Sequence, residues 1–339
     1  IAKRHTRNLR HLYPAARILA VSSTGTNTQC PDGADAVVAL ATAIDTSPDY
    51  IIVATPAPFH LDVARMALGA DIPILIEKPL SNNFVDAANF VELCRANTRT
   101  PVGVGYCLRF LSTTKMVRTL LQENAIGQIY NVSAFVGQHL PLWRPDTDYK
   151  SSVSAQEKLG GGALLELSHE LDLLNWFFDD LSLKHSWLRP GAHLGIDVEE
   201  AANLVLTRKD GCHVAVHLDF LQPSVARRMS FAGHDGRIEW NLFENTVRIC
   251  KPSQNDEILT GTETDRNEMY LDMLSAFEGV IAGQSSTLAD VKAALKIMEL
   301  VSAVTLLAIF QFWILGGLVG RTRGKYGVKA PQTTGDEYF

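Results

Sequence analysis

The sequence predicts an α/β fold: a parallel sheet covered by helices, followed by an α+β domain with a mainly antiparallel, open sheet. Residues 16–105 alternate short apolar runs with helical stretches, which is typical of βαβ units around a parallel sheet. Beyond about residue 107 the runs alternate apolar and polar residues and are joined by hairpin-type turns. The length of 339 residues also favours two domains, at roughly 150 residues each.

Four nearly continuous apolar runs predict the parallel strands: ARILAVSST at 16–24, DYIIVAT at 49–55, IPILIEK at 72–78 and PVGVGY at 101–106. Strands that are covered by helices on both faces have this pattern. Helices are expected between them at 58–68 and 81–96, because apolar residues recur there at helical spacing and each stretch begins near Pro or Ser.

The second half of the chain predicts an antiparallel sheet interrupted by one strong helix. The expected strands are 128–138, 200–208, 212–221, 227–232, 237–242 and 246–250. Hairpin chemistry is present at Lys209-Asp210-Gly211 and at His234-Asp235-Gly236. The strong helix is expected at 163–178, and two more follow at 266–281 and 287–300.

Composition excludes several classes of protein. With 46% hydrophobic and 20% charged residues, the chain is neither disordered nor a small disulfide scaffold. The net charge of -6, with Lys and Arg scattered along the chain, gives no footprint for nucleic acid. The five cysteines are odd in number and lack any CxxC, so we expect a reducing cytoplasm and no metal site.

The two ends of the chain are unusual. IAKRHTRNL at the start is a basic helical pattern with no strand before it. Residues 300–320 contain no charge and are long enough to be a transmembrane candidate. We expect domains at 1–107 and 108–300, followed by an apolar segment and tail at 301–339.

A membrane anchor at 300–320 is the less favoured interpretation of that segment. With the rest of the chain in the cytoplasm, a spanning helix would place the basic residues Arg321, Arg323, Lys325 and Lys329 outside, against the positive-inside tendency. The alternatives are a buried terminal helix or a misread end of the chain.

Glu77-Lys78-Pro79 stands where the predicted strand 72–78 ends. In an open α/β sheet ligands bind beyond the carboxyl ends of the strands, so Lys78 is delivered toward a ligand cleft. Thr55-Pro56, followed by His60, stands at the same edge of the sheet, after strand 49–55. The alternatives are a surface lysine at a strand end and a rigid turn in which His60 packs.

Three glycines, Gly160-Gly161-Gly162, precede a helix with a polar strip formed by Glu166, His169 and Glu170, next to Asp172. A His beside carboxylates is a candidate acid/base group, because a carboxylate can orient the imidazole and adjust its pKa. The alternative is a solvated polar face of the helix.

Trp143-Arg144-Pro145 lies in a polar loop that leads to the three glycines. A Trp on a loop is costly unless its ring covers something, so this loop is either a lid over a ligand or an interface contact.

The order of the motifs is more specific than any one of them: IAKRHTRNL, ATPAPFHLDVA, IEKPLS, VGYCLRF, WRPDTDY, GGGALLELSHELD and HLDFL. Over roughly residues 1–300 this order resembles the glucose-fructose oxidoreductase, inositol dehydrogenase and rhizopine-catabolism (Gfo/Idh/MocA) family. The resemblance implies a Rossmann domain, an α+β domain whose open sheet commonly makes the oligomer interface, NAD or NADP as cofactor, and hydride transfer at a sugar or cyclitol carbinol carbon.

The resemblance also implies roles for individual residues. Lys78 matches the lysine that helps to bind substrate hydroxyls and stabilise the developing alkoxide, and His169 matches the usual proton acceptor. Glu166 takes the place of the family's preceding carboxylate, although three positions separate it from His169 here instead of four and an Asp is more usual. Asp172 keeps the H-x-x-D spacing, and Arg109 matches an arginine near the substrate.

The remaining matches concern the cofactor. Residues expected to line the dinucleotide are Thr55, Pro56, His60, Glu77 and Pro79, while Trp143 and Arg144 match the loop that closes over the nicotinamide side. Ser22 and Ser23 stand where an Asp or Glu would hold the ribose 2'-hydroxyl, which gives NADP a slight preference over NAD.

One family feature is missing. The family begins with a strand and a G-x-G-x-x-G/A turn that brings the backbone to the pyrophosphate. Ile1-Ala2-Lys3 resembles the residues that come after the second glycine of that turn, so we expect a first strand to be missing and this chain to bind cofactor poorly.

The sequence therefore predicts a cytoplasmic, homo-oligomeric NAD(P)-dependent oxidoreductase acting on a sugar, nucleotide sugar or cyclitol, with Lys78 and His169 in the reaction. The alternative is a non-catalytic binding or regulatory protein that kept the fold and lost the nucleotide-binding turn.

Overall fold

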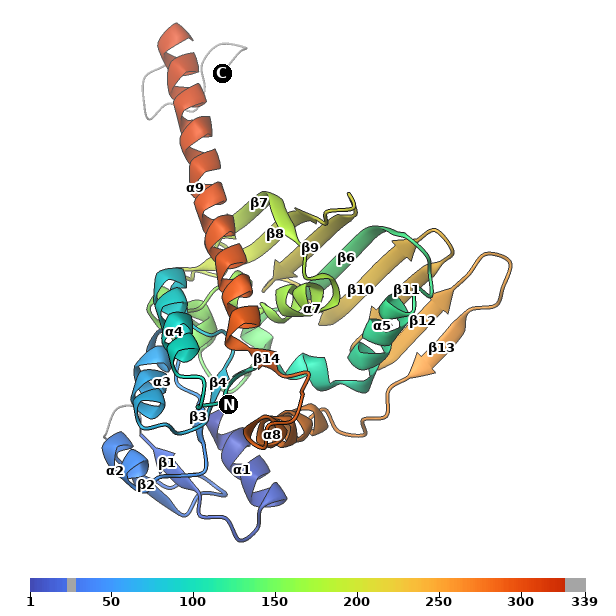
Figure 1. The fold of residues 1–339 in the computed structure, drawn as a ribbon. Coiled ribbons are helices and arrows are strands. Elements are labelled where there is room, and N and C mark those ends of the chain that lie inside the picture. Colours follow the sequence, from blue (N-terminus) through green and yellow to red (C-terminus); the bar gives the residue numbers. More distant parts are fainter. Residues whose placement is uncertain (23–28, 327–339) are drawn as a thin grey trace.

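The structure is a computed structural model that describes residues 1–22 and 29–326. Its first domain is built from parallel strands and covering helices, and its second from a large, mostly antiparallel sheet (Figure 1). This arrangement confirms the fold class that the sequence predicts. The basic pattern at the start of the chain forms helix α1, Ala2–Leu12, as expected.

The parallel strands fall into two sheets. Strands β1 (Leu19–Val21) and β2 (Ala36–Val38) pair with each other. Strands β3 (Ile51–Val53), β4 (Ile74–Glu77) and β5 (Val102–Gly105) form the other sheet, in which β14 (Ala289–Asp290) pairs antiparallel with β5. The connecting helices are α2 (Leu40–Asp45), α3 (His60–Gly69) and α4 (Phe84–Ala96).

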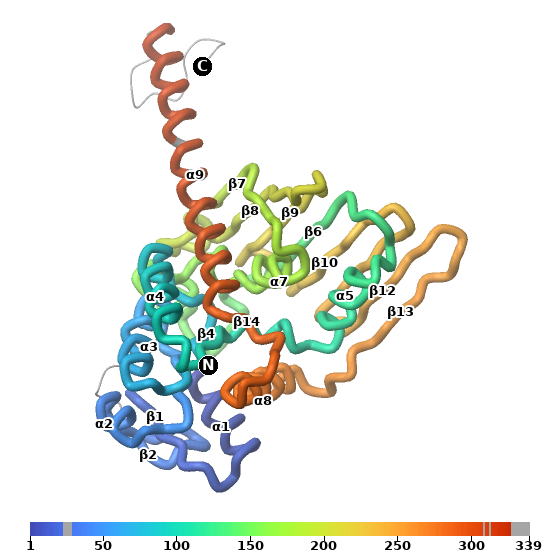
Figure 2. The backbone as a smooth tube through the Cα atoms, viewed as in Figure 1, coloured from blue at the N-terminus to red at the C-terminus, as the bar shows by residue number. Residues whose placement is uncertain are grey.

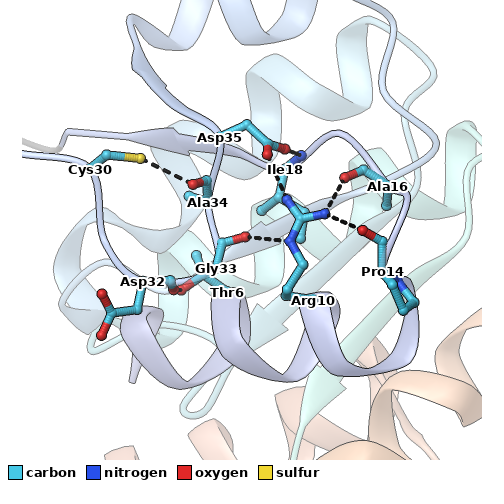
Figure 3. Close-up of polar contacts among 10 residues, drawn as sticks. All are labelled: Thr6, Arg10, Pro14, Ala16, Ile18, Cys30, Asp32, Gly33, Ala34 and Asp35. Atoms are coloured by element: carbon cyan, nitrogen blue, oxygen red, sulfur yellow. Dashed lines mark hydrogen bonds and ion pairs between the residues drawn. The ribbon is translucent and has the colours of Figure 1, made fainter.

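Arg10 of α1 joins the helix to the β1–β2 sheet (Figure 3). Its guanidinium donates to the carbonyls of Pro14 and Ala16, both at 2.8 Å, and to that of Gly33 at 3.2 Å. Its Nη2 also pairs with Oδ1 of Asp35 at 2.7 Å. The other carboxylate oxygen of Asp35 accepts from the backbone N–H of Ile18, the residue before β1. Because these donors bind the chain itself, we regard Arg10 as a structural residue.

The second domain contains an eight-stranded sheet in the order β13-β12-β11-β10-β6-β9-β8-β7. All neighbours are antiparallel except β6 and β9, which are parallel. The strands are β6 (Ile129–Gly137), β7 (Ser182–Pro190), β8 (Glu199–Thr207), β9 (His213–Asp219), β10 (Ala226–Gly233), β11 (Arg237–Asn241), β12 (Thr246–Cys250) and β13 (Glu257–Thr260). In Figure 1, helices α5 (Ser112–Gln122) and α7 (His169–Phe178) cover one face of this sheet.

The predicted helix 163–178 is wrong in one respect. The structure divides it into α6, Ala163–Glu166, and α7, with a break at Leu167 and Ser168. Short 3-10 helices precede it or connect other elements, at Ala57–Phe59, Cys107–Phe110, Leu140–Leu142, Tyr149–Ser151, Val153–Ala155 and Glu157–Leu159.

Strand β4 is buried on both faces, which explains its continuous apolar sequence. Ile74 and Ile76 belong to the large core that extends to Leu171 of α7. Leu75 faces a smaller cluster with Phe277 of α8, Glu268–Ile281. Because both faces of β4 are packed, the residues that follow it are held rigidly.

The last helix, α9, spans Val291–Tyr326 and is much longer than the expected 287–300. Its first part packs against β7, α4 and α7. Its second part projects away from the body of the molecule (Figures 1 and 2).

Candidate active site

Lys78 stands directly after β4, and its Nζ donates to the backbone carbonyl of Glu166 at 2.8 Å. The side chain of Glu166 lies elsewhere, because one of its carboxylate oxygens accepts from Ser154 Oγ at 3.1 Å. The residue expected as a catalytic carboxylate therefore meets Lys78 through its main chain. This contact brings the lysine of the first domain to the segment that leads to His169.

His169 is the first residue of α7 and is 9% exposed. Its ring meets the ring of Tyr106 edge-on, with 5.7 Å between centroids. Burial lowers the pKa of His169 well below 6.5, and the charges of Lys78 and Arg227 lower it further. The imidazole is therefore neutral at neutral pH and able to accept a proton.

The three glycines shape the turn into α6. Gly162 has φ of 106°, and a Cβ there would lie 2.4 Å from Glu199 Oε1. That carboxylate oxygen accepts from the backbone N–H of Leu164 at 2.9 Å, in the first turn of α6. A side chain at position 162 would thus both strain the backbone and displace the carboxylate that caps the helix.

Arg109 and Asp172, expected as substrate-binding and catalytic residues, form a buried ion pair. Nε and Nη2 of Arg109 donate to the two carboxylate oxygens of Asp172 at 2.8 and 2.6 Å. The remaining guanidinium nitrogen donates to the carbonyl of Thr287 at 3.3 Å. The structure thus pairs these two residues in the interior, and their charged groups bond each other and the protein backbone.

A second buried ion pair escaped the sequence analysis. Glu170 is fully buried, and its Oε1 lies 2.7 Å from Nε of Arg227 in β10. A solvated polar helix face is therefore the wrong interpretation, since Glu170, Asp172 and His169 are all buried. Arg227 stands next to a second arginine, at the start of a strand in which apolar and polar residues otherwise alternate. That arginine pair is the sequence signal that could have revealed it.

His60 ties two strand ends together. Its Nε2 lies 2.7 Å from the carbonyl of Thr55 after β3, and its Nδ1 lies 2.8 Å from the carbonyl of Pro79 after β4. Burial lowers the pKa of His60, while the two carbonyls oppose this. His60 therefore links the loop after β3 to the loop after β4. The peptide bond between Lys78 and Pro79 is cis.

Glu77 pairs with His5 of α1, with 2.6 Å between Oε1 and Nε2, and both side chains are buried. This contact places α1 against the carboxyl end of β4.

Trp143 is half-buried: its Nε1 donates to the carbonyl of Gln138 at 3.3 Å and its ring meets Phe220 edge-on. Arg144 is exposed, and both residues line a small cavity with Leu140, Thr147, Tyr149, Ser152 and Ser154. Ser154 also bonds Glu166, so this cavity adjoins the Lys78 site. Ser22 follows β1, and Ser23 lies outside the described residues.

The residues at this edge fit a nicotinamide dinucleotide. Thr55 Oγ1 and His169 Nδ1 are buried and bond no atom of the described chain, so both are available to a ligand. Lys78 and Arg144 supply positive charge for an anionic group, and Pro56 and Pro79 stiffen the loops around it.

Two family models match the chain. Residues 1–106 match "Oxidoreductase family, NAD-binding Rossmann fold", and residues 114–239 match "GFO/IDH/MocA C-terminal domain". The two matches follow each other in the order that the resemblance implies.

Curated relatives include the rhizopine catabolism protein MocA of Rhizobium meliloti, 26% identical over 38% of this chain and 37% of that protein. Inositol 2-dehydrogenase of Acidiphilium cryptum is 26% identical over 64% of each chain. A dTDP-3,4-didehydro-2,6-dideoxy-alpha-D-glucose 3-reductase of Saccharopolyspora spinosa is 31% identical over 51% of this chain and 49% of the relative. Each match thus spans less than two thirds of the relative's length.

Solved structures share the fold. An oxidoreductase domain protein from Kribbella flavida has a TM-score of 0.80 at 16% identity, covering 91% of this chain and 94% of that one. An inositol dehydrogenase homolog from Azotobacter vinelandii, complexed with NAD+, has a TM-score of 0.71 at 15% identity, covering 87% and 96%. Motifs, fold and family models agree, and the chain belongs to the Gfo/Idh/MocA family of oxidoreductases, with an NAD-binding Rossmann domain.

Proposed function

We propose that the chain is an NAD(P)-dependent oxidoreductase that transfers a hydride between the cofactor and a carbinol carbon of a sugar, nucleotide sugar or cyclitol. The main support is the hydrogen bond from Lys78 to the segment that leads to His169. The lysine donates to the carbonyl of Glu166 at 2.8 Å, and its charge contributes to the lowered pKa of His169. The family membership and the names of the relatives support the same chemistry.

In the direction of oxidation, the neutral imidazole of His169 accepts the hydroxyl proton while the carbinol carbon loses its hydride. When bound, the nicotinamide ring supplies the acceptor for that hydride and its electron pair. Lys78 uses one N–H for the carbonyl of Glu166, which leaves two donors of the ammonium for the substrate oxygen. Its positive charge offsets the negative charge that develops on that oxygen.

The other site residues are assigned as positioning residues in this proposal. Glu166 holds Lys78 through its carbonyl, and Arg109 with Asp172 holds α7, which begins at His169. Around the cofactor, Thr55 offers a hydroxyl and Trp143 with Arg144 borders the nicotinamide side. Direct substrate contact is assigned to Lys78 and His169.

Turnover of the purified chain tests the proposal. NAD+ and NADP+, each at millimolar concentration, are offered with cyclitols, sugars and nucleotide sugars, and formation of the reduced cofactor is measured. We expect turnover on at least one of these classes, and its loss in Lys78→Ala with retention in Lys115→Ala, an exposed lysine of α5. No turnover on any class, or equal turnover in both variants, would favour the non-catalytic alternative. The two KM values decide between NAD and NADP.

We also propose a cytoplasmic homo-oligomer that uses the sheet face opposite α5 and α7. Phe135, His217 and Arg228 share this face: the ring of His217 stacks on Phe135 at 4.9 Å, and the Arg228 guanidinium lies 4.5 Å from the same ring. Light scattering of the purified protein would give the mass, and Phe135→Glu should reduce it to that of a single chain. An unchanged mass in that variant would exclude this face.

A further inference from the structure

We infer that the exposed apolar part of α9 inserts into one leaflet of a lipid bilayer and attaches the protein to a membrane surface. Within the described residues, Val291–Tyr326 is long and apolar enough to enter a membrane, with a mean hydropathy of 2.0 over its most apolar window. The buried part of this helix ends near Val304, which is fully buried and whose carbonyl accepts from Ser186 Oγ of β7. Beyond that point large apolar side chains lie in solvent.

The exposed apolar residues form a continuous stripe on the side that faces away from the body. Leu306, Ile309, Phe310 and Trp313 follow each other at i, i+3, i+4 and i+7, and Trp313 is 75% exposed. Gln311 lies on the opposite side, where its Nε2 is 3.0 Å from His185 Nδ1 of β7. The helix is thus held to the body on one side and presents its apolar stripe on the other.

Further along, the helix is apolar on every side. Leu315 and Val319 lie on the same side of the helix as the buried Val304. Both are nevertheless exposed, because the helix at that point has passed beyond the two domains. A groove on a protein partner covers one side of a helix, whereas acyl chains cover all of it. Glycines 316, 317 and 320 also disfavour an isolated helix in water, while a bilayer favours it because backbone groups must be paired there.

Length and charge favour insertion into one leaflet over a full span. Residues 312–320, beyond the contact at Gln311, are about 14 Å long at 1.5 Å per residue, too short to cross the roughly 30 Å of hydrocarbon. A helix that lies along the interface of one leaflet keeps the residues after 320 at the level of the headgroups. Arg321, Arg323 and Lys325 follow at once and suit anionic headgroups. In one leaflet these basic residues stay on the side of the catalytic domains, so the objection from the positive-inside tendency does not apply.

Flotation with vesicles tests the inference on the full chain. We expect the protein to float with vesicles of phosphatidylcholine and phosphatidylserine, and less with phosphatidylcholine alone. The double variant Ile309→Asp/Trp313→Asp should reduce the floating fraction roughly tenfold or more, because carboxylates strongly oppose insertion. Met66→Asp, at an exposed methionine of α3 outside the stripe, is the matched control and should float as the parent does.

The depth of Trp313 tests the one-leaflet form. Its fluorescence, obtained as the difference between the parent and Trp313→Phe, should be quenched most by lipids brominated near the headgroup end of the acyl chain. Strongest quenching at the chain terminus would overturn insertion into one leaflet. A parent that stays at the bottom of the gradient, or that forms helix-dependent oligomers without binding vesicles, would overturn the inference as a whole. Turnover should be unaltered in the double variant, so that a loss of vesicle binding is distinguished from a failure of the proposed enzymatic function.

Discussion

Arg109 and Asp172 form a bidentate ion pair in which both side chains are at most 4% exposed. Arg109 belongs to the segment that follows β5, and Asp172 is the fourth residue of α7, which begins at His169. The pair therefore connects the parallel sheet of the first domain to the helix that begins at His169, the proposed proton acceptor. It lies at the join between the two domains.

Replacing Arg109 by Leu should cost about 3–5 kcal/mol in the free energy of unfolding, because it leaves the Asp172 carboxylate buried without a partner. The free energy would be measured by urea unfolding. Arg99→Ala is the matched control: Arg99 pairs with Asp71 at 3.4 Å but is 82% exposed, so its loss should cost about 1 kcal/mol or less. A raised KM in Arg109→Leu with no loss of stability would instead support the substrate contact that the sequence predicts.

Replacing Arg227 by Gln should raise the pKa of His169, because one of the positive charges that lower it is removed. The acid limb of the kcat/KM profile should then move to higher pH, while Arg227→Lys should restore the parent profile. Arg228→Gln removes the same charge from the opposite face of β10 and should leave the limb unchanged. A limb that moves equally in both Gln variants would contradict a specific effect on His169.

The stability of the protein should fall as the pH drops below about 6.5. The folded pKa values of His169 and His60 are lowered by burial, so below 6.5 the unfolded chain binds protons that the folded chain does not. The free energy of unfolding then decreases by up to about 1.4 kcal/mol per pH unit for each group. His169→Asn should remove its share of this slope. An identical slope in parent and His169→Asn would show that His169 is protonated equally in both states.

Gly162→Ala should destabilise the protein by about 3 kcal/mol, through backbone strain at φ of 106° together with displacement of the Glu199 cap. Gly211→Ala separates the two causes. Gly211 also has a positive φ, of 87°, but a Cβ there meets nothing within 4 Å, so only about 1 kcal/mol of strain is expected. Thermal or urea unfolding of both variants measures the difference, and equal losses would show that the contact with Glu199 has no energetic weight.

The parallel strands could be predicted because burial on both faces makes them continuously apolar. β4 is the clearest case, with Ile74 and Leu75 packed in different clusters. β7 could not be predicted in this way: it reads SLKHSWLRP, and Ser186 is its buried residue, under α9. Its place in the sheet depends on pairing with β8, which local sequence does not reveal. The three-residue β2 and the mostly polar α5 were missed for similar reasons.

The motifs singled out Lys78 and His169 as candidate site residues, but they could not show what surrounds them. Arg109 and Asp172 are 63 positions apart, and Glu170 and Arg227 are 57 apart, so only the folded chain pairs them. The spacing of Glu166 suggested a carboxylate next to His169, whereas a helix break at Leu167 and Ser168 turns its carbonyl toward Lys78 instead.

The central claim is that Lys78 and His169 act on the same reacting hydroxyl, and a double-mutant cycle of kcat/KM tests it most directly. Lys78→Met and His169→Asn should each lower kcat/KM by about 10²–10⁴, as expected for loss of a charge-stabilising or proton-accepting group. If both act in one transition state, the double variant should lose far less than the product of the two single losses. Losses that multiply fully would show that the two residues act independently and would contradict the proposed site.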